Sequence, residues 1–229
     1  MRIDGVDQHG TLQTSTELTH GGEPEAVVWR QGFETVRPLD AFRDAAGELV
    51  LRLLVRPRGD GPPPVQRAPG RDRGLVIPAG VVPEVRQRLA AYAVVRSSRG
   101  LLATEYSART AVQGRWGMPG GGIDEGEEPA AAVLREVHEE TAQQVVLGEL
   151  VRVQTSHWVG RSPRRTIEDF QAVRLIYLAD CADPGEPVVL DTGGTTETAR
   201  WVPLSSWAAL PWTENWRSVL TDLLGEPLG

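Results

Sequence analysis

The sequence predicts an α+β fold, an α/β/α layered domain, with an N-terminal extension of mainly β or irregular structure. Runs rich in β-branched and aromatic residues are mixed with two segments that have the apolar spacing of helices, and such elements pack in layers. Residues 57–83 contain too much proline and glycine for a continuous helix or a central strand. We therefore expect an extension over residues 1–83, with its linker at 57–83, and one domain over residues 84–229.

The composition is that of a globular chain, and its charge argues against one class of partner. The chain has 229 residues, of which 40% are hydrophobic and 24% charged, close to globular averages. Its formal net charge of -7 argues against tight binding to the backbone of a nucleic acid, which requires a basic face. All basic residues are arginine, so lysine-based chemistry is excluded. We expect no nucleic-acid partner.

The single cysteine and the length of the apolar runs indicate the compartment. Cys181 cannot form an internal disulfide, and we interpret it as a small buried apolar residue. Residues 1–10 lack the apolar core of a signal peptide, and the longest apolar runs are shorter than the roughly 20 residues needed to cross a bilayer. These features predict a cytoplasmic protein without a membrane partner.

The strands and the last helix of the domain can be placed along the chain. The segments "LAAYAVVR" and "GLLATEYS" are separated by "SSR" and are typical of a β-hairpin. Further strands are expected at three later segments: "ELVRVQTSHWV", "DFQAVRLIYLADC" and "ETARWVPL". The ending "WTENWRSVLTDLLG" predicts a helix, with Thr213 as its N-cap and Gly225 as its C-terminal stop.

The extension contains one strongly apolar segment, "ELVLRLLV". With the residues that follow, it predicts one or two strands, whereas "RPLDAFRDAAG" before it predicts a short helix or turn. A segment of this length is too short to build a core of its own and too hydrophobic to stay in solvent. We expect it to pair with an edge of the domain's sheet or with a second subunit in a homodimer. The alternative is a small autonomous β domain.

An acidic helix follows a glycine-rich turn in the middle of the chain. Pro129 suits the first turn of a helix over residues 128–141, in which Glu136, Glu139 and Glu140 fall on one face. Like charges at this spacing repel each other, and carboxylates without nitrogen or sulfur ligands suit Mg²⁺ or Mn²⁺. An isolated acidic face is more often simply solvated. The preceding "PGGGIDEGE" favours a metal site, because glycine allows the backbone to approach a ligand closely.

This stretch resembles the Nudix box, whose pattern is G, five residues, E, seven residues, REU, one residue, EE, one residue, G, U, with U aliphatic. The matching residues are Gly121, Glu127, Arg135, Glu136, Val137, Glu139 and Glu140. Ala142 stands where the family has glycine, and Gln143 stands where it has an aliphatic residue. These departures affect the end of the helix and leave every carboxylate in place. The resemblance implies a Nudix-type α/β/α sandwich over about residues 84–225.

The resemblance also implies roles for the residues of the box. The metal would be held by three carboxylates and one backbone group: Glu136, Glu139, Glu140 and Gly120. Glu136 would be either a ligand or the group that activates water, and Arg135 would orient the carboxylates through charge-assisted hydrogen bonds. The backbone of Gly120 and Gly121 would approach the phosphates of the substrate, and Glu127 would brace the loop.

Two further groups of residues after the box are candidates for the site. Many members of the family need another acid from a later loop, for which Glu197 is the first candidate and Glu168 the second. The connection "SHWVGRSPRRTIEDF" could form a lid, in which Arg164 and Arg165 meet phosphate and Trp158 stacks on a base. The alternative is a solvated arginine-rich loop with Trp158 packed inward.

The resemblance implies a Mg²⁺-dependent hydrolase that cleaves the diphosphate linkage of a nucleoside di- or triphosphate derivative, with Mn²⁺ as a substitute. The alternative is a Nudix-fold sensor or regulator that binds a nucleotide without turnover, but the complete set of three glutamates favours the enzyme. An isopentenyl diphosphate isomerase of the same fold is disfavoured, because the only cysteine, Cys181, lies well after the box. Residues that mark ADP-ribose or dinucleoside polyphosphate hydrolases are absent near the box, which leaves a nucleoside triphosphate as the default substrate.

Overall fold

The computed structural model describes residues 1–66, 68–162 and 166–225. The chain folds into two compact units whose segments alternate along the sequence. The first unit is built from three segments: Met1–Ala90, Gly122–Pro129 and Leu150–Leu175. The second unit is built from the other three: Ala91–Gly121, Ala130–Glu149 and Ile176–Gly229.

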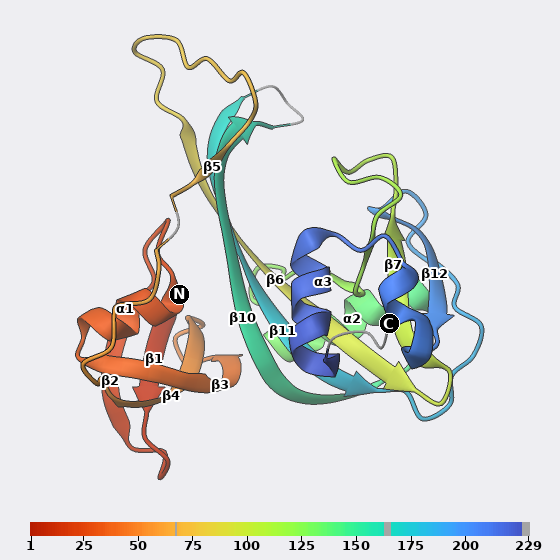
Figure 1. Ribbon diagram of the computed structural model, residues 1–229, viewed down its shortest axis with the longest axis horizontal. Helices are drawn as coiled ribbons and strands as arrows, with labels where there is room; N and C mark the ends of the chain where they lie inside the picture. The colour runs from red at the N-terminus through yellow and green to blue at the C-terminus, as the bar shows by residue number, and fades with distance from the viewer. Residues whose placement is uncertain (67, 163–165, 226–229) are drawn as a thin grey trace. The chain divides into compact units, whose positions relative to one another are not determined.

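The first unit begins with a four-stranded sheet of its own, in the order β2-β1-β4-β3 (Figure 1). Its elements are β1 (Arg2–Val6), β2 (Leu12–Glu17), α1 (Pro24–Arg30), β3 (Phe33–Arg43) and β4 (Leu49–Pro57). β1 pairs antiparallel with β2 and parallel with β4, and β3 pairs antiparallel with β4. The start of the chain is therefore mainly β, as the sequence predicts.

Strand β4, which contains most of "ELVLRLLV", lies inside this sheet. Val50 and Leu51 are fully buried, and Leu53 is nearly so. Because β1 and β3 occupy both edges of β4, the expected pairing of this segment with an edge of the domain's sheet is wrong. Ile3 of β1 and Val28 of α1 are also fully buried. Several short segments together thus bury the apolar surface that a single segment could not bury alone.

Strand β3 replaces the helix or turn expected at "RPLDAFRDAAG". The strand continues as far as Arg43, and only the last residues turn, where the Gly47 N–H donates to the Asp44 carbonyl at 2.8 Å. The register with β4 shifts on both sides of Pro38, and an edge strand with bulges tolerates a residue that has no N–H. The expectation failed because pairing with β4 across the hairpin, rather than the preference of the segment itself, decides the conformation.

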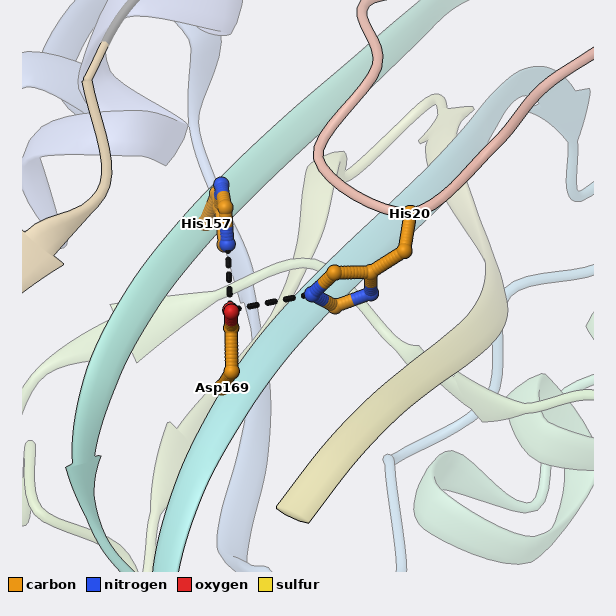
Figure 2. Close-up of side chains that lie close together, drawn as sticks. All are labelled: His20, His157 and Asp169. Atoms are coloured by element: carbon orange, nitrogen blue, oxygen red, sulfur yellow. Dashed lines mark hydrogen bonds and ion pairs between the residues drawn. The ribbon is translucent and has the colours of Figure 1, made fainter. Parts of the chain in front are cut away.

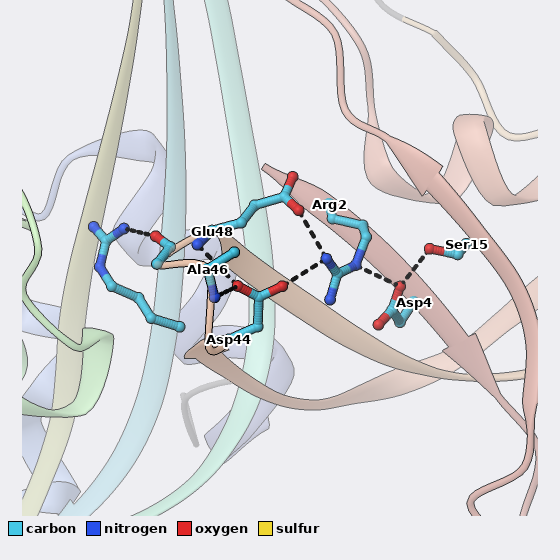
Figure 3. Close-up of polar contacts among 8 residues, drawn as sticks. Arg2, Asp4, Ser15, Asp44, Ala46 and Glu48 are labelled. Carbon is cyan, nitrogen blue, oxygen red and sulfur yellow. Dashed lines mark hydrogen bonds and ion pairs between the residues drawn. The ribbon is translucent and has the colours of Figure 1, made fainter.

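Arg2 ties the start of β1 to the turn between β3 and β4 (Figure 3). Its Nη1 donates to Asp44 Oδ2 and to Glu48 Oε2, both at 2.7 Å, and its Nε donates to Asp4 Oδ1 at 3.1 Å. Asp4 Oδ1 also accepts from Ser15 Oγ at 2.7 Å, which adds β2 to the network. The hydrogen bond from Arg2 holds the pKa of Asp44 below its usual value, so this carboxylate stays charged.

A second sheet has the strand order β12-β7-β6-β11-β10-β5, with β8 paired to β7 and β9 paired to β6. Its strands are β5 (Gly70–Arg71), β6 (Glu84–Ser97), β7 (Gly100–Tyr106), β8 (Trp116–Gly117), β9 (Gly120–Gly122), β10 (Val146–Arg161), β11 (Ile167–Asp180) and β12 (Thr196–Val202). β6 and β7 form the predicted hairpin, with Ser97 opposite Gly100. The long strands β6, β10 and β11 each contribute residues to both units.

Three helical elements follow in the second half of the chain: α2 (Pro129–Thr141), the 3₁₀ helix η1 (Leu204–Ala209) and α3 (Glu214–Leu224). The predicted ends of α3 are confirmed, because the Trp216 N–H donates to Thr213 Oγ1 at 3.4 Å and Gly225 has a φ of 85°. The Trp216 ring packs edge-on against Tyr92 of β6, with ring centroids 5.2 Å apart. Mixed sheets with a few helices confirm the predicted α+β class. None of the helices in the described residues is long and apolar enough to cross a membrane.

Gly100, the first residue of β7, provides a test of the packing between β7 and β12. Its φ is 111°, and an added Cβ would overlap the carbonyl group of Val202. We expect Gly100→Ala to lower the free energy of unfolding by several kcal/mol, because it adds both backbone strain and a steric clash. In the control Gly10→Ala, with a φ of 79° and no atom within 4 Å of an added Cβ, only the strain of about 1 kcal/mol applies. Urea unfolding measures both values, and equal losses would contradict the packing explanation.

Candidate active site

Helix α2 presents its three box glutamates at different depths. Val133 and Val137 are fully buried, so one face of the helix packs against the core. The Glu139 side chain is 43% exposed and the Glu136 side chain 17%, whereas Glu140 as a whole is only 7% exposed. The spacing of about 100° per residue places all three on one side of the helix, as predicted. Glu140 is therefore the buried carboxylate of the set.

The carboxylate of Glu140 is held by donors from two strands. Its Oε2 accepts from the Gly120 N–H of β9 at 3.0 Å, and its Oε1 accepts from the Thr196 hydroxyl of β12. Burial raises the pKa of Glu140 to about 7, against the two hydrogen bonds, which lower it. The negative charges of Glu136 and Asp191 add to the rise. Glu140 is thus fixed in orientation while its ionised form is destabilised.

Gly120 and Gly121 bring the backbone of β9 against the helix. A Cβ added at Gly121 would lie 2.5 Å from the carboxylate of Glu136. Gly120 has a φ of 144°, and a Cβ added there would overlap the Ala91 carbonyl. Only glycine therefore fits at either position. The structure brings the Gly120 N–H to Glu140 and places Gly121 beside Glu136.

Arg135 lies beside the other two carboxylates. Its Nη1 donates to Glu136 Oε1 at 2.9 Å and to Glu139 Oε2 at 3.1 Å. These charge-assisted hydrogen bonds offset the repulsion between the two glutamates. The three box glutamates are not among the groups of described residues whose ligand atoms all lie within 4.8 Å of one another.

The donor set of the box fits a hard divalent cation. Three carboxylates and a backbone group provide the all-oxygen environment that Mg²⁺ prefers, and Mg²⁺ uses few protein ligands because it keeps several waters. A Cβ would fill the space beside Glu136, and glycine at position 121 leaves that space open. The half-exposed Glu139 side chain is able to rotate away from Arg135. The residues present therefore suit Mg²⁺ in chemistry and in space.

Glu127 braces the glycine-rich turn, which is the role expected for it. Its Oε2 accepts from the Asp124 N–H at 3.0 Å, and its own N–H donates to the Asp124 carbonyl at 3.1 Å. Arg43 Nε donates to the Glu127 carbonyl at 2.8 Å. These three residues all lie in the first unit.

The two candidates for a late-loop acid lie in different units. Glu197 is exposed at a β-bulge of β12, where the register shifts between Thr196 and Thr198. The residue of β12 that contacts Glu140 is its neighbour Thr196. Glu168 lies on β11 in the first unit, with Oε1 3.6 Å from Arg86 Nε.

Thr196 and Asp191 are neighbours of the box that the sequence analysis missed. The Thr196 hydroxyl donates to Glu140, and the Asp191 carboxylate lies close enough to raise the pKa of Glu140. The Asp191 N–H donates to the Glu139 carbonyl at 3.0 Å, which places this loop at the end of α2. The glycines in "LDTGGTTET" indicate a loop, but a loop signal does not identify its partner.

The expected lid is largely strand. β10 includes all of "SHWVGR", and β11 begins at Ile167, so little of the segment is a free connection. The Trp158 ring packs on Phe170, with centroids 4.5 Å apart, in the first unit. This contact favours the alternative in which Trp158 packs inward. Arg164 and Arg165 lie outside the described residues.

The two departures from the box have structural consequences at the end of α2. Ala142 has a φ of 56°, and its N–H donates to the His138 carbonyl at 2.8 Å, so it occupies the left-handed position that favours glycine. Gln143 is buried, where its Oε1 accepts from the Gly185 N–H at 3.0 Å and its Nε2 donates to the Thr141 carbonyl at 3.1 Å. A buried amide thus holds a later loop at the place where the family has an apolar side chain.

Ala142→Gly should raise the free energy of unfolding by up to about 1 kcal/mol. The left-handed conformation costs alanine roughly 1–2 kcal/mol, and glycine avoids this cost. Glycine also gives the unfolded chain more conformational freedom, which offsets a part of the gain in stability. In the control Ala131→Gly, at an exposed helical position of α2, stability should fall by about 1 kcal/mol. Chemical denaturation measures both variants. A loss of stability in Ala142→Gly would show that the left-handed backbone is not strained.

The raised pKa of Glu140 should make the stability of the metal-free chain depend on pH. The stabilisation from protonated Glu140 is fully present below pH 4.5, the pKa of glutamate in the unfolded chain. It is lost as the pH rises through about 7, the pKa in the folded chain. Because glutamine mimics the neutral acid, Glu140→Gln should gain stability relative to the unsubstituted chain between about pH 5 and about pH 8. Melting temperatures in excess chelator measure this difference. A difference that stays constant with pH would contradict the raised pKa.

Known proteins are similar to this chain over the box and over the residues on both sides of it. A family model described as "NUDIX domain" matches residues 86–223. "RNA pyrophosphohydrolase" of Azorhizobium caulinodans is 38% identical over 111 residues, which are 42% of this chain and 62% of that protein. "Nudix hydrolase 26, chloroplastic" of Arabidopsis thaliana is 35% identical over 77 residues, which are 34% of this chain and 33% of that protein. The chain thus spans less than two thirds of the length of these relatives.

A solved structure also matches more than half of this chain. The crystal structure of a MutT NUDIX hydrolase from Burkholderia pseudomallei has 26% sequence identity and a TM-score of 0.44, and the match covers 59% of this chain and 96% of that one. The family model alone matches more than half of the chain and includes all the box residues on α2. The chain belongs to the Nudix family.

Proposed function

We propose that this chain is a Mg²⁺-dependent hydrolase that cleaves the diphosphate linkage of a nucleoside di- or triphosphate derivative. The observation that carries the proposal is the set of three box glutamates that α2 holds beside the glycine backbone of β9. A surface helix with a merely solvated acidic face would not need a buried glutamate fixed by two donors from other strands. The family membership supports the same class of reaction.

In this proposal the metal ligands are Glu136, Glu139, Glu140 and the backbone of Gly120, with Mn²⁺ able to replace Mg²⁺. A bound divalent cation neutralises charge on diphosphate oxygens and lowers the pKa of a coordinated water. The chain's own residues do the positioning: Arg135 orients Glu136 and Glu139, and Thr196 orients Glu140. Glu136 is less buried than Glu140 and is the candidate to accept the proton of the attacking water.

The further acid has two candidates in this proposal. Glu197 is the residue that the sequence favours, and its exposed position on β12 leaves it accessible to a substrate. Asp191 is the residue that the structure adds, because its charge acts on Glu140. Both lie in the second unit with α2.

The proposal assigns the hydrolase to residues 84–229 and a supporting role to residues 1–83. The extension would add surface that influences the choice of substrate, and Arg43 of its sheet contacts the Glu127 carbonyl of the box. Free nucleoside triphosphates are the first substrates to examine. An RNA with a 5′-triphosphate belongs in the same panel, because the relative from A. caulinodans is named an RNA pyrophosphohydrolase.

Glu140→Gln should lower the rate of hydrolysis by about 100-fold or more. Replacing a metal ligand is expected to reduce activity more than replacing a residue that hydrogen-bonds to a ligand. The fold should stay intact, since the amide oxygen can still accept from the Gly120 N–H and the amide nitrogen can donate to the Thr196 hydroxyl oxygen. The measurement is release of phosphate or pyrophosphate from the nucleotide panel in Mg²⁺, with and without excess chelator. The matched control is Glu125→Gln, an exposed acid of the preceding turn, which should keep full activity.

Two outcomes would contradict the proposal. Full activity of Glu140→Gln, or of the unsubstituted chain in excess chelator, would exclude metal-dependent hydrolysis at the box. Binding of a nucleotide without turnover of any member of the panel would favour the sensor instead.

A further inference from the structure

Two histidines and an aspartate meet in the first unit, away from α2 in the sequence and outside the proposed hydrolase chemistry (Figure 2). His20 Nε2 lies 2.9 Å from Asp169 Oδ1, and His157 Nε2 lies 2.5 Å from the same oxygen. The two rings are nearly perpendicular, with centroids 5.1 Å apart. One nitrogen of each ring therefore converges on a single carboxylate oxygen.

The three side chains come from three separate parts of the chain. His20 lies in the turn after β2, His157 on β10 and Asp169 on β11. His20 and Asp169 are 149 residues apart in the sequence. Of the His, Cys, Asp and Glu residues that the structure describes, these three form the group whose ligand atoms all lie within 4.8 Å of one another.

A buried glutamine fixes the turn that carries His20. Gln171, which is almost fully buried, accepts from the Gly21 N–H at 2.8 Å and donates to the Gly22 carbonyl at 2.7 Å. Because alternate residues of a strand share a face, Gln171 and Asp169 lie on the same side of β11. β11 therefore holds the backbone after His20 through Gln171 and contacts the His20 side chain through Asp169.

Glycine and a second contact bring His157 to the same place. Gly21 has a φ of 76°, and a Cβ added there would lie 3.1 Å from His157 Cε1, so the ring packs where a side chain is missing. Thr155, on the same face of β10 as His157, donates to Glu23 at the start of α1. Contacts of the three residues that follow His20 thus anchor the turn to β10 and β11.

The cluster is accessible from solvent. His20 and His157 line a surface cavity of about 510 Å³, together with the turn residues Gly21 and Gly22. The side chains of the cluster are partly exposed rather than sealed in the core. A cation and its water ligands can therefore reach the converging nitrogen and oxygen atoms.

The donor set differs in kind from that of the box. Two imidazole nitrogens and one carboxylate oxygen suit Zn²⁺ and similar transition metals, whereas Mg²⁺ prefers oxygen ligands alone. Metal–ligand distances of about 2.0–2.1 Å around a tetrahedral ion place the donors roughly 3.3 Å apart. The two nitrogen–oxygen separations of 2.9 and 2.5 Å are shorter than this, and all three donor atoms lie within 4.8 Å of one another, so a cation requires the side chains to move slightly apart.

We propose that His20, His157 and Asp169 form a binding site for a transition-metal ion of the Zn²⁺ class, with water at the remaining position. The ion replaces the two hydrogen bonds to Asp169 with three coordination bonds. It fastens the turn after β2 to β10 and β11, and thereby stabilises the first unit. In this assignment the ion anchors the turn, and it shares no ligand with the Mg²⁺ site proposed on α2.

The test uses the full chain, stripped of metal and titrated with Zn²⁺ in excess Mg²⁺, which occupies the box carboxylates. We expect one Zn²⁺ per chain with a dissociation constant in the micromolar range or tighter, and a rise in melting temperature with Zn²⁺ concentration. His157→Gln and Asp169→Asn should each weaken binding by about 100-fold or more. Co²⁺ in place of Zn²⁺ should give visible absorption bands that these variants lose.

The chain provides a matched control, because His9 is an exposed histidine in the turn between β1 and β2. His9→Gln should bind Zn²⁺ as the unsubstituted chain does. The assignment is overturned if the unsubstituted chain takes up no Zn²⁺, which would leave the cluster a hydrogen-bonded contact only. It is also overturned if the cluster variants bind as tightly as His9→Gln. Should one cluster variant fail to fold, the Zn²⁺ stoichiometry and the Co²⁺ spectrum of the unsubstituted chain still decide.

Discussion

The missing side chains at Gly120 and Gly121 are the constraint on which the box depends. With a Cβ at position 121, the carboxylate of Glu136 would be displaced, and with one at position 120, the backbone would collide with β6. Because neither atom is present, β9 approaches α2 closely enough for the Gly120 N–H to reach Glu140 at 3.0 Å. Together with the Thr196 hydroxyl, this contact fixes the orientation of the Glu140 carboxylate.

Close approach has an electrostatic cost, and other parts of the second unit offset it. Burial raises the pKa of Glu140 to about 7, so the ionised carboxylate is destabilised where it is needed. Thr196 and Gly120 supply hydrogen bonds that oppose this effect, and Arg135 supplies a positive charge to the two more exposed glutamates. The same region tolerates a left-handed alanine at position 142, as strained residues persist only where their surroundings hold them in place.

In the first unit, glycine also allows a close approach, here between two histidines and an aspartate. Gly21 lacks the side chain that would keep His157 away from the turn, and Gln171 holds the backbone on which His20 is carried. In both places glycine permits an approach and a buried polar group fixes it. The donors differ, however: oxygen atoms at the box favour Mg²⁺, and two imidazoles with one carboxylate favour a Zn²⁺-class ion. Such a difference would allow two cations to occupy one chain without competing.

Local sequence determined the parts of this protein whose signals lie within one element. The spacing of Glu136, Glu139 and Glu140 placed them on one helix face, and Thr213 marked the start of α3. The tertiary structure alone decided which distant residues meet: Thr196 with Glu140, and His20 with Asp169. It also made a strand of the segment expected to be a helix or turn, because pairing with β4 outweighs local preference. Periodicity and capping report contacts a few residues apart, whereas contacts between strands depend on sheet order and register, which no local pattern encodes.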